Sequence, residues 1–190
     1  MKTIFSLPTD IYKNRRLIFK LAKNDFKTRY AGSYLGIVWA FIQPVITILV
    51  YWFVFSVGFR SGTGDLGVPF VLYLVAGIVP WFFFQDALIG GTNSMLEYNY
   101  LVKKVVFNIS VLPVVKIISA LFVHCFFVLF TIILYAAYGK FPDVYYFQLI
   151  YYSICVFILV LGLSYATSAI VIFFRDLTQI INIALQVGIW

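Results

Sequence analysis

Residues 11–30 read IYKNRRLIFKLAKNDFKTRY, and residues 34–59 read YLGIVWAFIQPVITILVYWFVFSVGF, with only residues 31–33 between them. The first stretch is amphipathic and rich in lysine and arginine, whereas the second is almost entirely apolar. A bilayer core about 30 Å thick needs about 20 residues of helix, so the second stretch is long enough to cross it. The junction predicts a helix on the membrane surface that continues directly into a membrane span.

The composition excludes a soluble protein. Hydrophobic residues make up 63% of the chain and charged residues only 11%, whereas soluble domains carry about 25% charged residues. We therefore predict an all-α, polytopic membrane protein with a single domain over residues 1–190. The last apolar stretch still continues where the sequence stops, so a further C-terminal portion is expected. The predicted spans are residues 34–59, 69–89, 112–138, 145–174 and an incomplete one over 177–190.

The distribution of basic residues predicts a cytoplasmic N-terminus. Eight of the fourteen lysines and arginines precede the first span, and Lys103, Lys104 and Arg175 follow on the same predicted side. The loops on the opposite side carry only Arg60 and Lys140. Cytoplasmic segments of membrane proteins carry this excess of Lys and Arg. It also explains the net charge of +7 without a nucleic-acid partner.

Basic and apolar side chains occupy opposite faces of the helix predicted over residues 11–30. One interpretation is a polybasic anchor that binds anionic lipid. The other is a docking surface for a soluble cytoplasmic partner, and the pattern leaves both open. The basic face consists of Lys13, Arg16, Lys20, Lys23 and Lys27, and the apolar face of Ile11, Ile18, Phe19, Ala22, Phe26 and Tyr30.

Residues 90–108 form the longest polar interruption between spans and lie on the predicted cytoplasmic side. Residues 94–106 fit a short helix with Asn93 or Ser94 as its N-cap and Glu97 near its first turn. One hypothesis is a lever through which a soluble motor moves the membrane domain. The alternative is an ordinary cytoplasmic loop.

Few ionisable residues lie inside the predicted spans. His124 is interpreted as a neutral, hydrogen-bonded packing residue in preference to a proton relay, because no carboxylate lies one turn away. Asp86 is expected to face the membrane interface or to pair with a basic residue of a loop. Lys116 is expected to extend its side chain toward the cytoplasmic surface.

Tyrosine and tryptophan residues are concentrated in the outer halves of the predicted spans. They can form the aromatic belt found at membrane interfaces. They can also line a path for a sugar polymer, because the C–H face of a pyranose packs on an aromatic ring while tyrosine hydroxyls bond its hydroxyls. The candidate path residues are Tyr51, Trp52, Tyr73, Tyr145 and Tyr152.

The sequence contains no catalytic or metal-ligand pattern. It has no paired carboxylates, no Ser-His-Asp set and no G-x-x-x-x-G-K-[ST] phosphate loop. Cys125 and Cys155 lie in apolar runs without C-x-x-C spacing, so we interpret them as small hydrophobic residues. An integral-membrane glycosyltransferase or acyltransferase is therefore disfavoured, and any energy source is expected on another subunit.

Several short blocks, taken together and in order, resemble the membrane subunit of bacterial ABC-type polysaccharide exporters. These permeases move lipid-linked O-antigen, teichoic acid or capsule polymers. The resemblance covers essentially the whole chain. The blocks are residues 25–30 (DFKTRY), 33–36 (SYLG) with Trp39 and Pro44, 76–84 (AGIVPWFFF), 91–94 (GTNS), 101–104 (LVKK) and 173–177 (FFRDL).

The resemblance implies a six-span permease of the bacterial cytoplasmic (inner) membrane that works as a homodimer with two copies of an ATP-binding cassette subunit. ATP and Mg²⁺ would bind to that subunit, and this chain would bind no cofactor and carry no enzymatic activity of its own. Export of drugs or small lipids on the same scaffold is the alternative function. The residues implied in coupling to the ATPase are Lys27, Arg29, Tyr30, Glu97, Tyr98, Leu101, Lys103 and Lys104.

Overall fold

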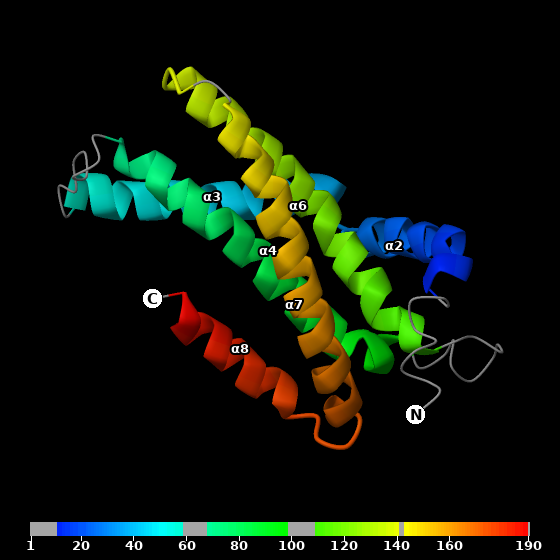
Figure 1. Cartoon of the computed structure of the whole chain (residues 1–190). Helices are drawn as coiled ribbons and strands as arrows, with labels where there is room; N and C mark the ends of the chain where they lie inside the picture. The colour runs from blue at the N-terminus through cyan, green and yellow to red at the C-terminus, as the bar shows by residue number, and fades with distance from the viewer. Residues whose placement is uncertain (1–10, 59–67, 99–108, 141–142, 190) are drawn as a thin grey trace.

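The computed structural model describes residues 11–58, 68–98, 109–140 and 143–189, and over these ranges it is helical and contains no strand (Figure 1). Short helical turns extend three of the helices: Gly36–Val38 and Val54–Gly58 flank α3, Ile109–Val111 precedes α6, and Val144–Tyr146 precedes α7. The helices are α2 (Arg15–Arg29), α3 (Trp39–Phe53), α4 (Phe70–Glu97), α6 (Leu112–Ala137), α7 (Phe147–Val171) and α8 (Leu177–Gly188).

Four helical segments are long and apolar enough to cross a membrane, which confirms the prediction of a polytopic helical membrane protein. Each begins within a few residues of its predicted start. A fifth apolar helix, α8, begins at the predicted Leu177 and is shorter than a span over the described residues. The four segments are Gly36–Gly58, Phe70–Glu97, Ile109–Ala137 and Val144–Val171.

Helix α4 is longer than predicted and continues to Glu97, into the stretch that was expected to be a loop. We placed the end of this span at Ile89 and a new helix start at Asn93 or Ser94, and both predictions are wrong. Ser94 lies inside α4, where its buried hydroxyl donates a hydrogen bond to the carbonyl of Gly91. The rest of the predicted short helix, residues 99–106, lies outside the described residues.

Small side chains bring α4 and α7 into close contact near the C-terminal end of α4. A Cβ atom placed on Gly91 would lie only 2.6 Å from the Cβ of Ser164, which is fully buried. One turn away, the hydroxyls of Thr92 and Thr167 are 2.7 Å apart. Close approach through small residues is a common way for membrane helices to pack, because lipid provides no hydrophobic drive for their association.

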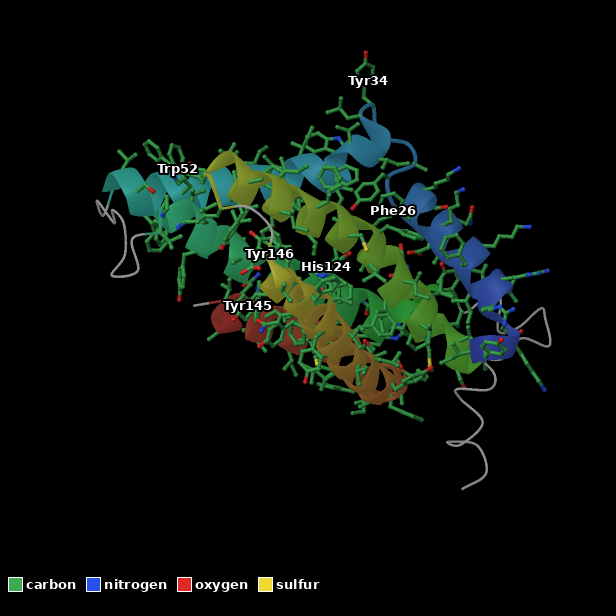
Figure 2. The ribbon with its side chains drawn as sticks, turned by 45° about the horizontal axis from the view of Figure 1, so that its top comes forward. Phe26, Tyr34, Trp52, His124, Tyr145 and Tyr146 are labelled. Carbon is green, nitrogen blue, oxygen red and sulfur yellow. The ribbon has the colours of Figure 1, made fainter. Side chains whose placement is uncertain are left out.

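Helix α3 packs more loosely than the other spans. Ala40 and Ile48 are its only buried residues, and Ile48 belongs to a core cluster with residues of α4 and α6 such as Val75 and Phe127. In Figure 1, α8 and α2 lie on opposite sides of α4. Just before α3, Tyr34 points away from all of the helices (Figure 2).

Because of the close contact at Gly91, adding a single methyl group at this position should destabilise the protein. Gly91→Ala should lower the melting temperature of the detergent-solubilised protein, because the overlap with Ser164 costs about 1–3 kcal/mol. Gly77→Ala in the same helix is the matched control, since an added Cβ there meets no atom within 4 Å. The control should be neutral or slightly stabilising, because alanine favours a helix over glycine by about 1 kcal/mol. Equal melting temperatures for both variants would contradict the close packing.

Candidate functional site

Helix α2 packs on α6 through the apolar face that the sequence predicts. Ile18 and Ala22 are buried against Val111, Val114 and Val115. Phe19 and Phe26 both make edge-to-face contacts with the ring of Phe122, with centroid distances of 5.7 and 5.9 Å; Phe26 is labelled on α2 in Figure 2. The basic face, formed by Lys13, Arg16, Lys20, Lys23 and Lys27, is exposed along its whole length.

Five charged side chains from α2, α4 and α6 meet at one end of the bundle, and we call them the ion cluster: Asp25, Arg29, Asp86, Glu97 and Lys116. Asp25 lies at its centre and is buried. Its Oδ1 atom accepts hydrogen bonds from Lys116 Nζ at 2.6 Å and from the hydroxyl of Tyr98 at 2.9 Å. Burial raises the pKa of the Asp25 carboxyl, but the hydrogen bond and charge of Lys116 outweigh it, so the pKa lies below its ordinary value. Asp25 is therefore held ionised.

Arg29, at the C-terminal end of α2, connects this helix to the middle of α4. Its Nη1 donates to both carboxylate oxygens of Asp86, at 2.7 Å each, and its Nη2 lies 3.6 Å from Asp25 Oδ2. Burial lowers the pKa of the Arg29 guanidinium, but the facing charge of Asp86 raises it above the ordinary value. Tyr30 follows directly and is half-buried, and its burial raises the pKa of its hydroxyl.

Lys116 is buried and paired within the protein, and its extension toward the cytoplasmic surface stays a prediction. Its side chain is only 7% exposed and forms salt bridges with Asp25 and Glu97. A buried ammonium group needs paired charges, and two carboxylates of neighbouring helices provide them. Asp86 pairs with a basic residue as expected, although its partner lies on the N-terminal helix and not in a loop.

Several of the predicted coupling residues come together in and around the ion cluster. Arg29 and Glu97 are members of it and Tyr98 bonds to it, whereas Lys27 lies on the exposed face of α2. Leu101, Lys103 and Lys104 lie outside the described residues.

A cavity of about 500 Å³ lies between α3, α4, α6 and α8, and we call it the central cavity. Three helices each contribute a glutamine to its wall: Gln43 from α3, Gln85 from α4 and Gln186 from α8. Within the described part of the chain, no side chain forms a hydrogen bond with these amides. The rings of Trp39 and Trp81 also line it. The cavity thus offers free amide donors and acceptors beside aromatic surface.

His124 is a buried packing residue that lies in the wall of the central cavity. Its ring stacks on Phe83, with a centroid distance of 4.6 Å, and its Nε2 atom is 3.2 Å from the hydroxyl of Ser153 on α7. Figure 2 shows it in the interior of the bundle. These contacts match the hydrogen-bonded packing role that was favoured over a proton relay.

The five predicted path aromatics do not gather along one surface. Tyr51 lines the central cavity, and with Tyr73 it lines a neighbouring cavity beside the end of α8. Tyr145 and Tyr152 line a separate apolar groove of about 280 Å³ between α4, α6 and α7. Trp52 is 40% exposed and lines none of the cavities found among the described residues. The aromatic path therefore stays a prediction, with Tyr51 as its member at the central cavity.

The three glutamines were missed by the sequence analysis. They are separated by 42 and 101 positions along the chain, so no local pattern connects them. One signal was present: each is a polar amide within or at the end of an apolar helix, and such residues tend to face the interior of a helical bundle.

Breaking the Asp25–Lys116 salt bridge should lower the stability of the protein, and an exposed lysine of the same region provides the control. Lys116→Met should lower the melting temperature in detergent by roughly 5–10 °C, because the loss of one partner of a buried charge pair costs about 3–5 kcal/mol and Asp25 keeps only Tyr98 and the more distant Arg29. Lys27→Met, on the exposed face of α2, should leave it unchanged. Asp25→Asn combined with Lys116→Met should recover part of the loss, since both charges are then absent. If the Lys116→Met and Lys27→Met variants have the same melting temperature, the salt bridge does not stabilise the fold.

Known proteins that resemble this chain are membrane transporters. Residues 16–190 match the ABC-2 type transporter family. The O-antigen export system permease protein RfbA of Myxococcus xanthus is 32% identical over 182 residues, which cover 93% of this chain and 66% of that protein. Two permease proteins of the same name from Klebsiella pneumoniae are each 25% identical over 173 residues, covering 90% of this chain and 64% of their own length.

The chain spans about two thirds of the length of these curated relatives. The family match includes α2 and every helix after it, so it covers both the ion cluster and the central cavity. The protein therefore belongs to the ABC-2 type transporter family of membrane proteins.

Proposed function

We propose that this chain is the permease subunit of an ATP-driven exporter of lipid-linked polysaccharide in the bacterial cytoplasmic membrane. It acts as a homodimer with two copies of an ATP-binding cassette subunit. That subunit binds ATP and Mg²⁺ and hydrolyses the nucleotide, and the permease itself has no enzymatic activity. The N-terminus and the basic face of α2 lie on the cytoplasmic side.

The central cavity is the observation that carries this proposal. A sugar unit presents hydroxyl groups that both donate and accept hydrogen bonds, and a glutamine amide offers both functions. Gln85 is half-buried, whereas Gln43 and Gln186 are exposed. A half-buried amide without a partner in a membrane bundle is costly unless a polar ligand or water meets it. A volume of about 500 Å³ holds a short segment of a polymer and not a folded chain, as expected of a path through which a long molecule is threaded.

The absence of charge on the three amides also favours a polymer over a single tightly bound ligand. Neutral amides form weak, interchangeable hydrogen bonds, so successive sugar units can replace one another along the cavity. The rings of Trp39 and Trp81 add contact area that does not depend on the identity of the sugar.

The supporting observation for an ATPase partner is the position of α2. Its basic face is free, while its opposite face is fixed to α6 and to the ion cluster. A partner that binds the basic face can thus pull on α6 and α4 through the Asp25–Lys116 and Lys116–Glu97 salt bridges. We infer that α2 and the C-terminal end of α4 form the surface that couples ATP hydrolysis to transport.

Export of a small lipid or drug is a second candidate function, favoured by the apolar groove between α4, α6 and α7. Its wall is mostly apolar, and its polar side chains are those of His124, Thr131, Ser153 and tyrosines such as Tyr145 and Tyr152. The two functions differ in which cavity they need. Substitutions in the central cavity should impair polymer export and leave small-lipid export intact.

Transport of polymer should depend on the cavity glutamines. In proteoliposomes that contain the full-length permease and its ATPase, Gln85→Leu or Gln186→Leu should slow ATP-dependent uptake of labelled lipid-linked polysaccharide about two- to tenfold, the equivalent of hydrogen bonds worth about 0.5–1.5 kcal/mol. Gln148→Leu is the matched control, because Gln148 is exposed on α7 and lines none of the cavities described above. Uptake that is unchanged in both cavity variants would argue against a polymer path through this cavity.

Assembly with the ATPase should depend on the basic face of α2. Replacing Lys20, Lys23 and Lys27 together by glutamine should reduce the amount of ATP-binding subunit that co-purifies with the permease, while the yield of membrane-inserted permease stays the same. Lys140→Gln serves as the control, since Lys140 lies in the loop after α6. If the triple variant retains the ATPase and instead loses binding to anionic lipid vesicles, the face is a lipid anchor.

A further inference from the structure

Asp86 lies in the walls of two cavities. It lines the central cavity, and it also lines a smaller cavity of about 320 Å³ beside the ion cluster. Ile89, one turn further along α4, lines both cavities as well. The second cavity is polar, because Asp25, Glu97 and Lys116 belong to its wall. Two polar spaces therefore meet at a single position of α4.

The Arg29 side chain lies at this meeting point. Its guanidinium group bonds to both oxygens of Asp86 at 2.7 Å, and it passes close to α4 at Gly90, where an added Cβ would lie 3.7 Å from Nη2. Tyr30, the next residue, lines the central cavity. The pair thus lies where the central cavity adjoins the space beside the ion cluster.

The pair joins two elements that share little other contact. The apolar face of α2 packs on α6 and not on α4, so the Arg29–Asp86 interaction is a side-chain bridge between α2 and α4. The Arg29 side chain is 24% exposed and that of Asp86 is 44% exposed. A partly exposed ion pair contributes less to stability than a buried one, so this bridge can open without disrupting the packing of α2 on α6.

We propose that the Arg29–Asp86 ion pair is a gate at the α2 end of the central cavity. While the pair is formed, it closes the passage between the cavity and the polar space beside the ion cluster. When α2 moves relative to α4, the pair separates and the two spaces join into one polar passage. Arg29 thereby has a second role besides holding α2 in place. Asp86 is the member of the pair that lines the central cavity, which is the proposed transport path. The transport aspect of this inference rests on the proposed function.

A leak assay tests the gate without any polymer or ATPase. Full-length permease is reconstituted in lipid vesicles, and the efflux of trapped radiolabelled mannitol, a small neutral polyol, is measured. Asp86→Ala and Arg29→Ala should each raise mannitol efflux roughly tenfold over wild type, because a polar passage replaces a charged seal. Asp176→Ala, an exposed aspartate in the turn before α8, should leave efflux at the wild-type level.

A charge exchange separates gating from loss of structure. Arg29→Asp combined with Asp86→Arg should return efflux toward the wild-type level, whereas either substitution alone should leak. If Asp86→Ala does not elute as a single species in detergent, Asp86→Asn replaces it, since asparagine keeps the size of the side chain and removes its charge. Wild-type efflux from folded Arg29 and Asp86 variants would overturn the proposal.

A cross-link tests whether the pair must open during transport. Arg29→Cys and Asp86→Cys are introduced together with Cys125→Ser and Cys155→Ser, and the new cysteines are joined by a short bis-methanethiosulfonate. The linked complex should lose polymer uptake and regain it after reduction. Uptake by the linked complex at the unlinked rate would overturn gating by this pair. If wild-type permease moves no polymer while the leak results hold, the proposed substrate is wrong and the gate stands.

Discussion

The salt bridge between Lys116 and Asp25 determines where the N-terminal helix lies. An ammonium group buried at the start of a membrane helix needs a carboxylate in contact with it, and Asp25 provides one. Successive residues of a helix are rotated by 100°, so Asp25 can reach Lys116 only in one rotation of α2. In that rotation Ile18 and Ala22 face α6, and the basic face is directed away from the bundle. A single buried charge pair thus sets which surface of α2 is available to other molecules.

Helix α4 connects the ion cluster to the rest of the bundle. Its 28 residues correspond to about 42 Å at 1.5 Å per residue, which exceeds a bilayer core of about 30 Å. The part near its C-terminal end carries Glu97 of the ion cluster, the close contact of Gly91 with Ser164, and a hydrogen bond of 2.8 Å from Thr178 of α8 to the side chain of Asn93. Midway along, Gln85 and Asp86 line the central cavity. One continuous helix therefore connects the coupling surface, the packing of α7 and α8, and the cavity wall.

The sequence predicts those features that depend on neighbours along the chain. Long apolar runs have few structural alternatives in a membrane, so the spans and the amphipathic α2 were found. The Gly-Gly-Thr-Asn-Ser run of α4 was read as the start of a loop because it interrupts the apolar sequence with polar residues. Here Gly91 instead makes room for Ser164 of α7, which is a tertiary effect. The pairing of Lys116 was not predicted for the same reason, since its partner Asp25 lies 91 positions earlier.

The loose packing of α3 has a consequence for the range of molecules that the protein can accommodate. The walls of the central cavity formed by α4 and α6 belong to tightly packed core clusters, whereas α3 contributes only two buried residues. Moving α3 outward would expose little apolar core. The fourth wall, α8, has one buried residue, Leu185. The cavity therefore has two stiff sides, α4 and α6, and two more compliant ones, α3 and α8. As the proposed transport path, a cavity of this kind can widen for bulky or branched units while α4 and α6 keep their packing, so the acceptance of varied substrates is compatible with a fixed helical frame.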